Sequence, residues 1–83
     1  MIKSCVIGLS KVGIIHCESL MKIKNTSLNY IFDKNYDLSK RLSKKFRCKT
    51  SRNFNSILKK KDIELFVIAS PTITHDFYIK KLI

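Results

Sequence analysis

The sequence predicts an α/β fold in three layers, a partial doubly wound parallel sheet of about four strands in the order 3-2-1-4, with helices on both faces. Three observations carry this prediction. An apolar strand at residues 3–7 runs directly into a turn with glycine at both ends, Gly8 and Gly13. The next apolar run ends on an acidic residue, Asp33. Strand-like and helix-like segments then alternate along all 83 residues without repeats or linkers, which is typical of parallel α/β domains.

The turn after the first strand has the spacing of a phosphate-binding loop. A helix that begins at the end of a buried strand directs its unpaired N–H groups and the positive end of its dipole into the crevice above the sheet. Glycine at the first position allows the tight turn, a small residue at the third allows close approach of the main chain, and glycine at the sixth lets the helix lie against the strand. The predicted phosphate-binding residues are Gly8, Leu9, Ser10, Lys11, Val12 and Gly13.

One position departs from the G-x-G-x-x-G pattern, because Ser10 occupies the second glycine site. If that site requires a positive φ, a side chain there costs about 1–3 kcal/mol, which weakens cofactor binding about tenfold or more. The serine hydroxyl can instead donate a hydrogen bond to a phosphate oxygen. Asp33, at the end of the second strand, is positioned to accept hydrogen bonds from a ribose hydroxyl. The competing interpretation of the turn is a helix cap in another kind of α/β protein.

Composition limits the size of the domain and its partners. A chain of 83 residues forms one small domain, and the net charge of +11 raises the question of nucleic-acid binding. Fourteen of the 17 basic residues are lysines spread over the whole chain, so we favour solvated lysines over a nucleic-acid interface. The cysteines, Cys5, Cys17 and Cys48, are far apart and are interpreted as buried thiols in a reducing cytoplasm, without a metal site. No apolar run is long enough for a membrane helix.

The first half of the chain predicts a helix from residue 11 to 22 or 24, a strand over 28–33 and a second helix whose last turn includes Arg47. The stripe of the first helix that faces the sheet is predicted to contain Gly13, Cys17, Leu20 and Met21. His16, beside this stripe, is interpreted as hydrogen-bonded to the backbone. The second helix is capped by Asn35 or Asp33.

The second half predicts a short edge strand over 48–50, a brief helix that begins at Asn53, and a strand over 65–69. This last strand is the most apolar stretch of the chain and is expected to be covered on both faces. Ser70-Pro71-Thr72 interrupts it at its carboxyl end, where ligands bind in open α/β sheets. Thr72 or Thr74 caps a final helix.

These motifs, in this order, resemble the N-terminal Rossmann domain of the oxidoreductases named for glucose-fructose oxidoreductase and inositol dehydrogenase, the Gfo/Idh/MocA family. The segments that carry the resemblance are Ile2-Lys3, the glycine turn followed by Ile15-His16, Ile31-Phe32-Asp33, Asn53-Phe54, and Ala69-Ser70-Pro71-Thr72 with Thr74-His75. The last segment is the most specific, because glycine turns occur in all dinucleotide-binding folds.

The resemblance implies an NAD(P)-dependent oxidoreductase of sugars, cyclitols or related polyols. By the same resemblance, Ala69, Ser70, Pro71 and Thr72 line the cofactor near its nicotinamide, and His75 closes the loop over the end of the strand. Thr72 departs from the family, which usually has asparagine there. The charge of Asp33 favours NAD, while the neighbouring Lys34 keeps NADP open as the alternative.

The family continues into two further strands and a substrate domain that holds its proton-transferring residues. We therefore expect residues 1–83 to be an incomplete cofactor-binding domain without independent catalysis. The fourth strand becomes an exposed edge, and leaving Phe66 and Ile68 uncovered forfeits about 3–6 kcal/mol. One alternative is a non-catalytic module that pairs through this edge with a second copy or with a full-length relative. Association with nucleic acid is the less favoured alternative.

Overall fold

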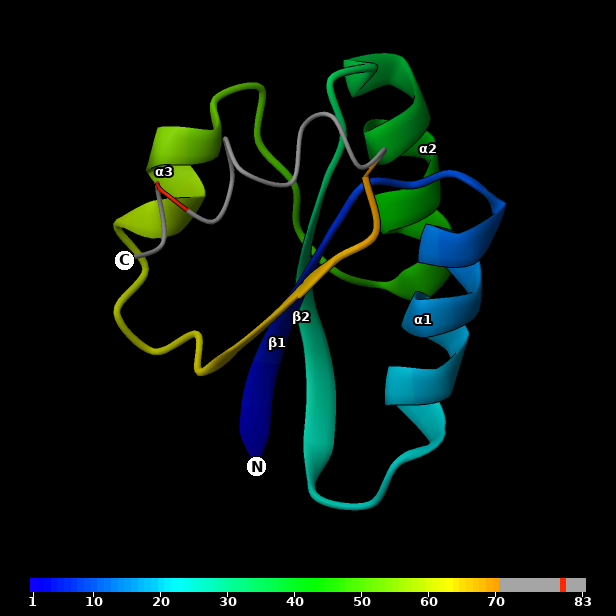
Figure 1. Ribbon diagram of the computed structural model, residues 1–83, viewed down its shortest axis with the longest axis vertical. Helices are drawn as coiled ribbons and strands as arrows, with labels where there is room; N and C mark the ends of the chain where they lie inside the picture. Colours follow the sequence, from blue (N-terminus) through cyan, green and yellow to red (C-terminus); the bar gives the residue numbers. More distant parts are fainter. Residues whose placement is uncertain (71–79, 81–83) are drawn as a thin grey trace.

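The structure is a computed structural model that describes residues 1–70 and residue 80, and all statements below concern these residues. The elements along the chain are β1 (Ile2–Ile7), α1 (Lys11–Lys22), β2 (Thr26–Phe32), α2 (Tyr36–Phe46), α3 (Phe54–Leu58) and β3 (Leu65–Ile68), as Figure 1 shows. The predicted α/β fold is therefore confirmed. The final helix predicted from Thr72 or Thr74 lies outside the described residues.

The sheet has three parallel strands in the order β2-β1-β3. β1 pairs with β2 from Ile2↔Thr26 to Ile7↔Phe32, with a register shift between Ser4 and Cys5. On its other side β1 pairs with β3 from Ser4↔Leu65 to Ile7↔Ile68. The predicted arrangement, with the first strand between the second and the last, is confirmed.

The strand predicted over residues 48–50 shrinks to a single bridge between Tyr30 and Lys49. Lys49 N–H donates to the Asn29 carbonyl, and Ile31 N–H donates to the Lys49 carbonyl, both at 2.9 Å. Before Lys49, Cys48 N–H donates to the Ser43 carbonyl near the end of α2 and is not available to β2. A few residues after Lys49, Asn53 N–H donates to the Ser51 hydroxyl where the chain turns into α3. The segment therefore lies beside β2, as predicted, but pairs through one residue only.

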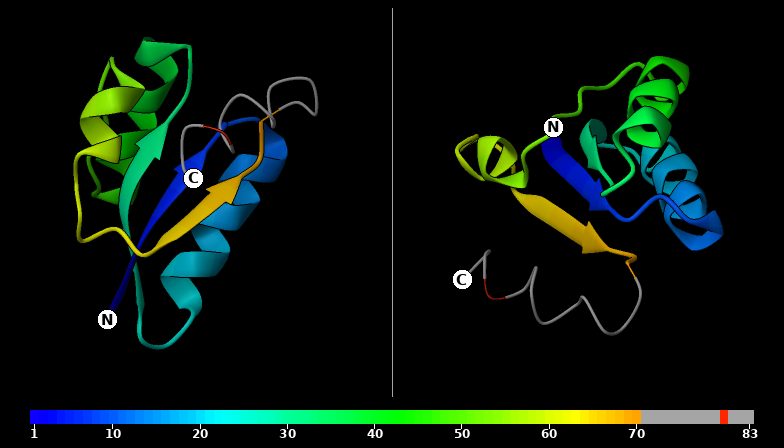
Figure 2. Two further views of the ribbon diagram at one scale, coloured as in Figure 1. Left: turned by 60° about the vertical axis from the view of Figure 1, so that its left-hand side comes forward. Right: turned by 90° about the horizontal axis from the view of Figure 1, so that it is seen from above.

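Helices cover both faces of the sheet, with α1 and α2 on one face and α3 on the other (Figure 2). Because side chains alternate along a strand, β1 sends Val6 into the core under α1 and α2, and Cys5 and Ile7 into the core under α3. On the α3 side the rings of Phe32 and Phe54 lie 5.2 Å apart between centroids. The result is a three-layer arrangement with one core on each side of the sheet.

Asparagine side chains begin two of the three helices. Asn35 Oδ1 accepts from Leu38 N–H at 3.1 Å, and Asn53 Oδ1 accepts from Asn55 N–H at 2.9 Å. These bonds satisfy donors that a helix N-terminus otherwise leaves unpaired. Of the two cap residues considered for α2, Asn35 holds the position and Asp33 is left free for other contacts.

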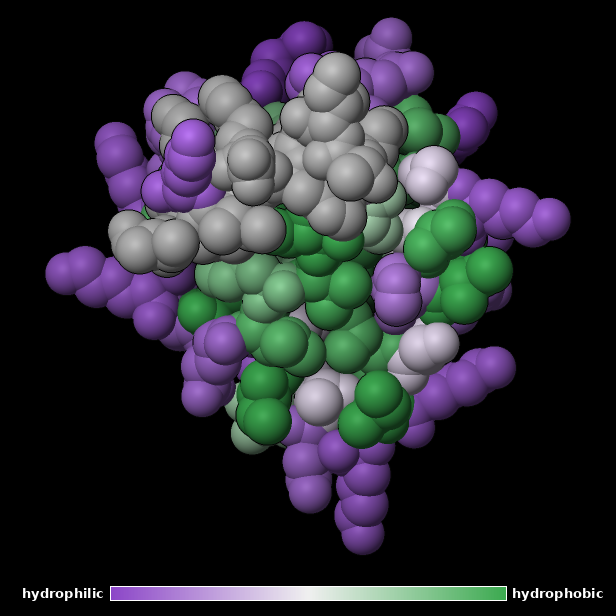
Figure 3. Space-filling view, viewed as in Figure 1, coloured by the Kyte–Doolittle hydropathy of each residue, from purple (hydrophilic) through white to green (hydrophobic). Residues whose placement is uncertain are grey.

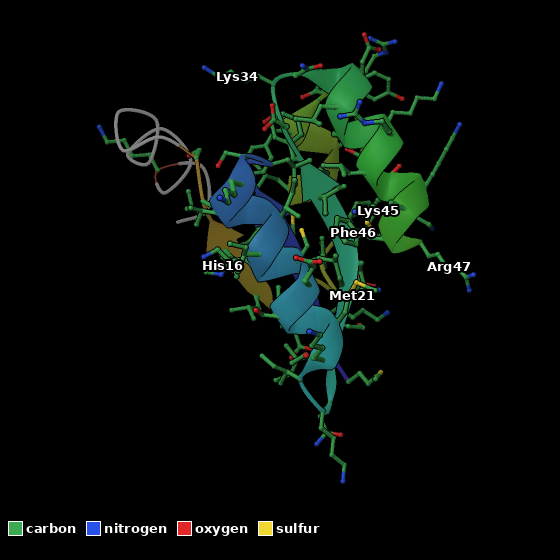
Figure 4. The ribbon with its side chains drawn as sticks, turned by 90° about the vertical axis from the view of Figure 1, so that its right-hand side faces the viewer. His16, Met21, Lys34, Lys45, Phe46 and Arg47 are labelled. Carbon is green, nitrogen blue, oxygen red and sulfur yellow. The ribbon has the colours of Figure 1, made fainter. Side chains whose placement is uncertain are left out.

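The sheet-facing stripe of α1 is narrower than the sequence predicts. Gly13, Cys17 and Leu20 are buried, but Met21 is 53% exposed. Each residue of a helix turns by about 100°, so Met21 points to the flank of α1 that is nearer to α2 (Figure 4). His16 projects from the opposite flank (Figure 4). It is exposed, and its side chain has no backbone hydrogen-bond partner among residues 1–70 and 80.

The three cysteines are free thiols; Cys5 and Cys17 are buried and Cys48 is half-buried. Burial raises the pKa of Cys17 to about 11 and that of Cys48 to about 12, and it raises the pKa of Cys5 well above its ordinary value. All three are therefore protonated at neutral pH and pack as small apolar groups. Within residues 1–70 and 80, no helix is long and apolar enough to cross a membrane.

Candidate functional site

Three segments meet at the carboxyl edge of the sheet, where the turn after β1, the residues after β2 and the end of β3 lie side by side (Figure 1). Gly8 N–H donates to the Phe32 carbonyl at 2.8 Å, which ties the first turn to the end of β2. Ala69 N–H donates to the Ile7 carbonyl at 2.7 Å, which ties the end of β3 to the same turn. These bonds bring together the predicted residues Gly8–Gly13, Asp33–Lys34 and Ala69–Ser70.

Gly8 makes the turn out of β1 with a φ of +94°, a conformation that L side chains rarely adopt. A Cβ at this position would lie 2.5 Å from the Ser70 amide nitrogen and 2.8 Å from the Ala69 carbonyl carbon. Both neighbours are backbone atoms, which cannot rotate away. Glycine at position 8 thus allows the main chains of the first turn and of the end of β3 to touch.

Gly13 lies in the first turn of α1 and is packed even more tightly. A Cβ here would lie 1.8 Å from the carbonyl oxygen of Gly8 and 3.6 Å from the Ala69 side chain. Real atoms do not approach that closely, so only glycine allows α1 to lie against the turn that precedes it. The two glycines of the turn therefore act as a pair, and the second packs directly on the first.

Ser10 is the N-cap of α1 and has φ −69° and ψ −177°, which is ordinary extended backbone. The strain considered for a side chain at this site is therefore absent, because the positive φ of the turn falls on Gly8. The Ser10 hydroxyl is exposed and does not cap the helix. Ile14 N–H makes the first bond back along the helix, to Ser10 at 2.9 Å, so the N–H groups of residues 11–13 lie before the helical ladder begins.

The electrostatics of this helix end favour an anion. The first turn of α1 has no acidic residue. Its first residue is the cation Lys11, which is exposed. Free N–H groups, the positive end of the helix dipole and a lysine together form a site that attracts phosphate. Val12 is also exposed here, with 55% of its surface accessible.

Asp33 connects the end of β2 to the glycine turn. Its Oδ2 accepts from Leu9 N–H at 2.8 Å, and its Oδ1 accepts from Asn35 N–H at 2.9 Å. Sequence reasoning predicted this carboxylate at the site but missed its bond to Leu9. A carboxylate has about four lone-pair positions, so both oxygens can still accept from ribose hydroxyls. Lys34 is exposed and projects away from the domain (Figure 4).

The end of β3 contributes Ala69 and Ser70, which are both half-buried. Ser70 Oγ is buried and has no hydrogen-bond partner in the described part of the chain, and Ser70 lies against Gly8. A buried hydroxyl of this kind requires a partner, which fits a polar ligand in the crevice. The remaining predicted residues, Pro71, Thr72 and His75, lie outside the described residues.

A family model described as "Oxidoreductase family, NAD-binding Rossmann fold" (Gfo/Idh/MocA) matches residues 2–83. No curated protein matches the chain. Among solved structures, a myo-inositol dehydrogenase from Lactobacillus casei in complex with NAD(H) and myo-inositol has a TM-score of 0.90 at 20% identity, over 99% of this chain and 25% of that one.

Two further solved structures show the same fold. A myo-inositol dehydrogenase from Corynebacterium glutamicum has a TM-score of 0.89 at 22% identity, over 98% of this chain and 24% of that one. KijD10, a 3-ketoreductase from Actinomadura kijaniata in complex with NADP, has a TM-score of 0.87 at 20% identity, over 98% of this chain and 25% of that one. The chain thus spans about a quarter of the length of the solved structures that it matches.

Proposed function

The chain belongs to the Gfo/Idh/MocA oxidoreductase family and forms its NAD-binding Rossmann domain, and from this we propose that the crevice at the carboxyl edge of the sheet holds the dinucleotide through the residues named above. The observation that carries the proposal is the pair of glycines. Gly8 and Gly13 have no room for a Cβ. They bring the turn against the end of β3 and against α1, where the N–H groups of residues 11–13 precede the first helical hydrogen bond and can receive a pyrophosphate.

The phosphates are assigned to the turn Gly8–Gly13. The N–H groups at the start of α1 donate to phosphate oxygens, and Lys11 supplies a positive charge. The Ser10 hydroxyl, which makes no capping bond, donates to a phosphate oxygen in the place where the usual motif has a second glycine. Leu9 and Val12 form the apolar sides of the turn.

Asp33 is assigned to the adenosine ribose, where its carboxylate accepts from the hydroxyls. Its negative charge repels a 2′-phosphate, so NAD is the preferred cofactor. Lys34 follows directly and is exposed, so it is the residue that would accommodate NADP. Ala69 and Ser70, with Pro71, Thr72 and His75 beyond the described residues, are assigned to the nicotinamide half.

The bound nicotinamide supplies hydride chemistry, and the role of this domain is to hold and orient the cofactor. We propose that residues 1–83 are the cofactor-binding part of a sugar or cyclitol oxidoreductase, without independent turnover. The solved relatives are about four times as long, and a substrate region of that kind would complete the site. We also propose a cytoplasmic location, where free thiols stay reduced.

Isothermal titration calorimetry of the purified chain with NAD and with NADP tests the cofactor assignment. We expect saturable binding of NAD, and binding of NADP that is weaker by about tenfold, which corresponds to about 1.4 kcal/mol of charge repulsion. Lys34→Gln should weaken NADP further and leave NAD unchanged. A chain that is folded by circular dichroism but binds neither dinucleotide would contradict the proposal.

The free edge of β3 supports a second function, self-association. β3 pairs with β1 on one side, and no strand among residues 1–70 pairs with its other side. Leu65 is 37% exposed, and the rest of β3 is only half-buried. In the view of Figure 1, where β3 lies at the front, apolar side chains gather over the middle of the molecule, below the grey atoms (Figure 3). We propose that the β3 edge pairs with the same strand of a second copy.

Sedimentation velocity over a range of protein concentrations checks this association. We expect a concentration-dependent dimer that Leu65→Lys abolishes, because a lysine on an edge strand opposes further pairing. Met21→Lys is the matched control, since Met21 is also exposed and apolar but lies on α1. A monomer at every concentration, or equal effects of both substitutions, would exclude the edge as an interface.

A further inference from the structure

A second site lies between α2 and α3, at the sheet edge opposite β3, and shares no residue with the proposed cofactor site. It is a groove of about 530 Å³ that is lined by α2, by residues 49–51 and by α3. The connection from α2 to α3 crosses from one face of the sheet to the other along this edge (Figure 2). We call it the basic groove, after its four lysines: Lys40, Lys44, Lys49 and Lys60.

The charges of the basic groove have one sign. None of its lining residues is acidic. The described residues contain one salt bridge, between Lys3 and Asp62, so none of the four lysines is neutralised by an ion pair there. Lys40 and Lys44 are one helical turn apart and therefore repel each other on the same side of α2. An anion in the groove would relieve this repulsion.

Hydroxyl groups complete the lining. Ser43 Oγ donates to the Lys40 carbonyl at 2.7 Å, and Ser51 Oγ donates to Ser56 Oγ at 3.1 Å. Thr50 Oγ1 is buried without a hydrogen-bond partner in the described part of the structure, which is unfavourable unless a ligand or a solvent molecule reaches it. Ser43 and Ser51 use their single hydroxyl hydrogens inside the protein, so Thr50 and Ser56 are the hydroxyl donors of the lining. Together with the lysines they are groups that bind phosphate oxygens.

The aromatic residues of the groove are not arranged to stack on bases. The Arg52 guanidinium lies 3.9 Å from the centroid of the Tyr36 ring, so it occupies one face of that ring. Tyr30 packs against the core under α3. Single-stranded nucleic acid binds through open aromatic faces as well as charge, whereas lysines alone bind phosphate as point charges. We infer that the basic groove binds a small polyanion with two or more phosphate groups.

Calorimetric titration with sodium tripolyphosphate tests the inference. The groove variant is Lys40→Gln/Lys44→Gln, and the matched control is Lys22→Gln/Lys24→Gln, which removes the same charge from exposed lysines outside the groove. We expect the groove variant to bind tripolyphosphate about tenfold more weakly than the wild type. The control should stay within about twofold, because only unspecific attraction is reduced.

Two further measurements separate this site from the others. The groove variant should keep its affinity for NAD, so that failure of the cofactor proposal and failure of this one are distinguishable. Equal losses in the two lysine variants would show unspecific attraction and overturn the inference. A short oligothymidylate that binds more tightly than tripolyphosphate, and is lost in the groove variant, would also overturn it in favour of nucleic acid.

Discussion

Replacing Gly13 with alanine should remove most of the stability of the domain. The added Cβ would lie 1.8 Å from the Gly8 carbonyl oxygen, a backbone atom that cannot move aside alone. α1 must then move away from the sheet, and Cys17 and Leu20, which are buried in the native structure, become exposed. Losing two such side chains costs about 3–6 kcal/mol, against a total stability of about 5–15 kcal/mol for a domain of this kind.

Urea denaturation followed by circular dichroism measures this effect. The direction is diagnostic, because Gly→Ala in an exposed helix stabilises by about 1 kcal/mol, opposite to the loss expected here. Ser19→Ala, at an exposed position of α1, serves as the control and should leave the midpoint nearly unchanged. An unchanged midpoint for Gly13→Ala would mean that α1 does not pack on Gly8 as described.

Asp33→Ala should weaken NAD binding by about 100-fold and also destabilise the free domain. Two hydrogen bonds from ribose hydroxyls to a charged acceptor account for the loss of affinity, at about 1.5 kcal/mol each. The destabilisation comes from Leu9, a residue only 2% exposed whose N–H donates to this carboxylate. Leaving such a donor unpaired costs about 1–3 kcal/mol.

Asp33→Asn separates the two effects. The amide oxygen can still accept from Leu9 N–H, so stability should recover, while the charge that repels a 2′-phosphate is gone. We expect this variant to bind NAD and NADP with similar affinity in calorimetry. Full NAD affinity in a folded Asp33→Ala protein would remove Asp33 from the site.

Local signals explain how much of the fold and the site the sequence predicts. Asn35 and Asn53 cap their helices through atoms two or three residues away, so the local sequence locates the start of α3 at Asn53 and that of α2 at Asn35 or Asp33. The spacing of Gly8 and Gly13 and the packing of Gly13 on Gly8 are equally local, because both lie in one strand-turn-helix segment, whereas the contact of Gly8 with Ala69 and Ser70 is remote. Asp33 is found by its distance from that turn. The positions of these residues, though not all of their contacts, can therefore be predicted from neighbouring residues alone.

The features that sequence reasoning missed depend on competition or on remote neighbours. The strand predicted over 48–50 is reduced to one bridge, because Cys48 N–H is bonded to the end of α2 and does not pair with β2. Met21 is exposed because the buried face of α1 is narrower than the run of apolar residues in its sequence indicates. The bond from Leu9 to Asp33 joins residues 24 positions apart. Lys40 and Lys60 belong to different segments of the sequence, and only the sheet edge brings them to one groove.

The position of β1 at the centre of the sheet has a consequence for the order of folding. β1 is the first element of the chain, and its two partners come from residues 26–32 and 65–68. During synthesis β1, α1 and β2 can associate early, whereas the second edge of β1 has no partner until residue 68 has emerged. Closing that long loop costs only about 0.6 kcal/mol more for each doubling of its length. The penalty is therefore mainly one of time, and in the interval an apolar strand with free N–H and C=O groups is available to chaperones and to neighbouring nascent chains.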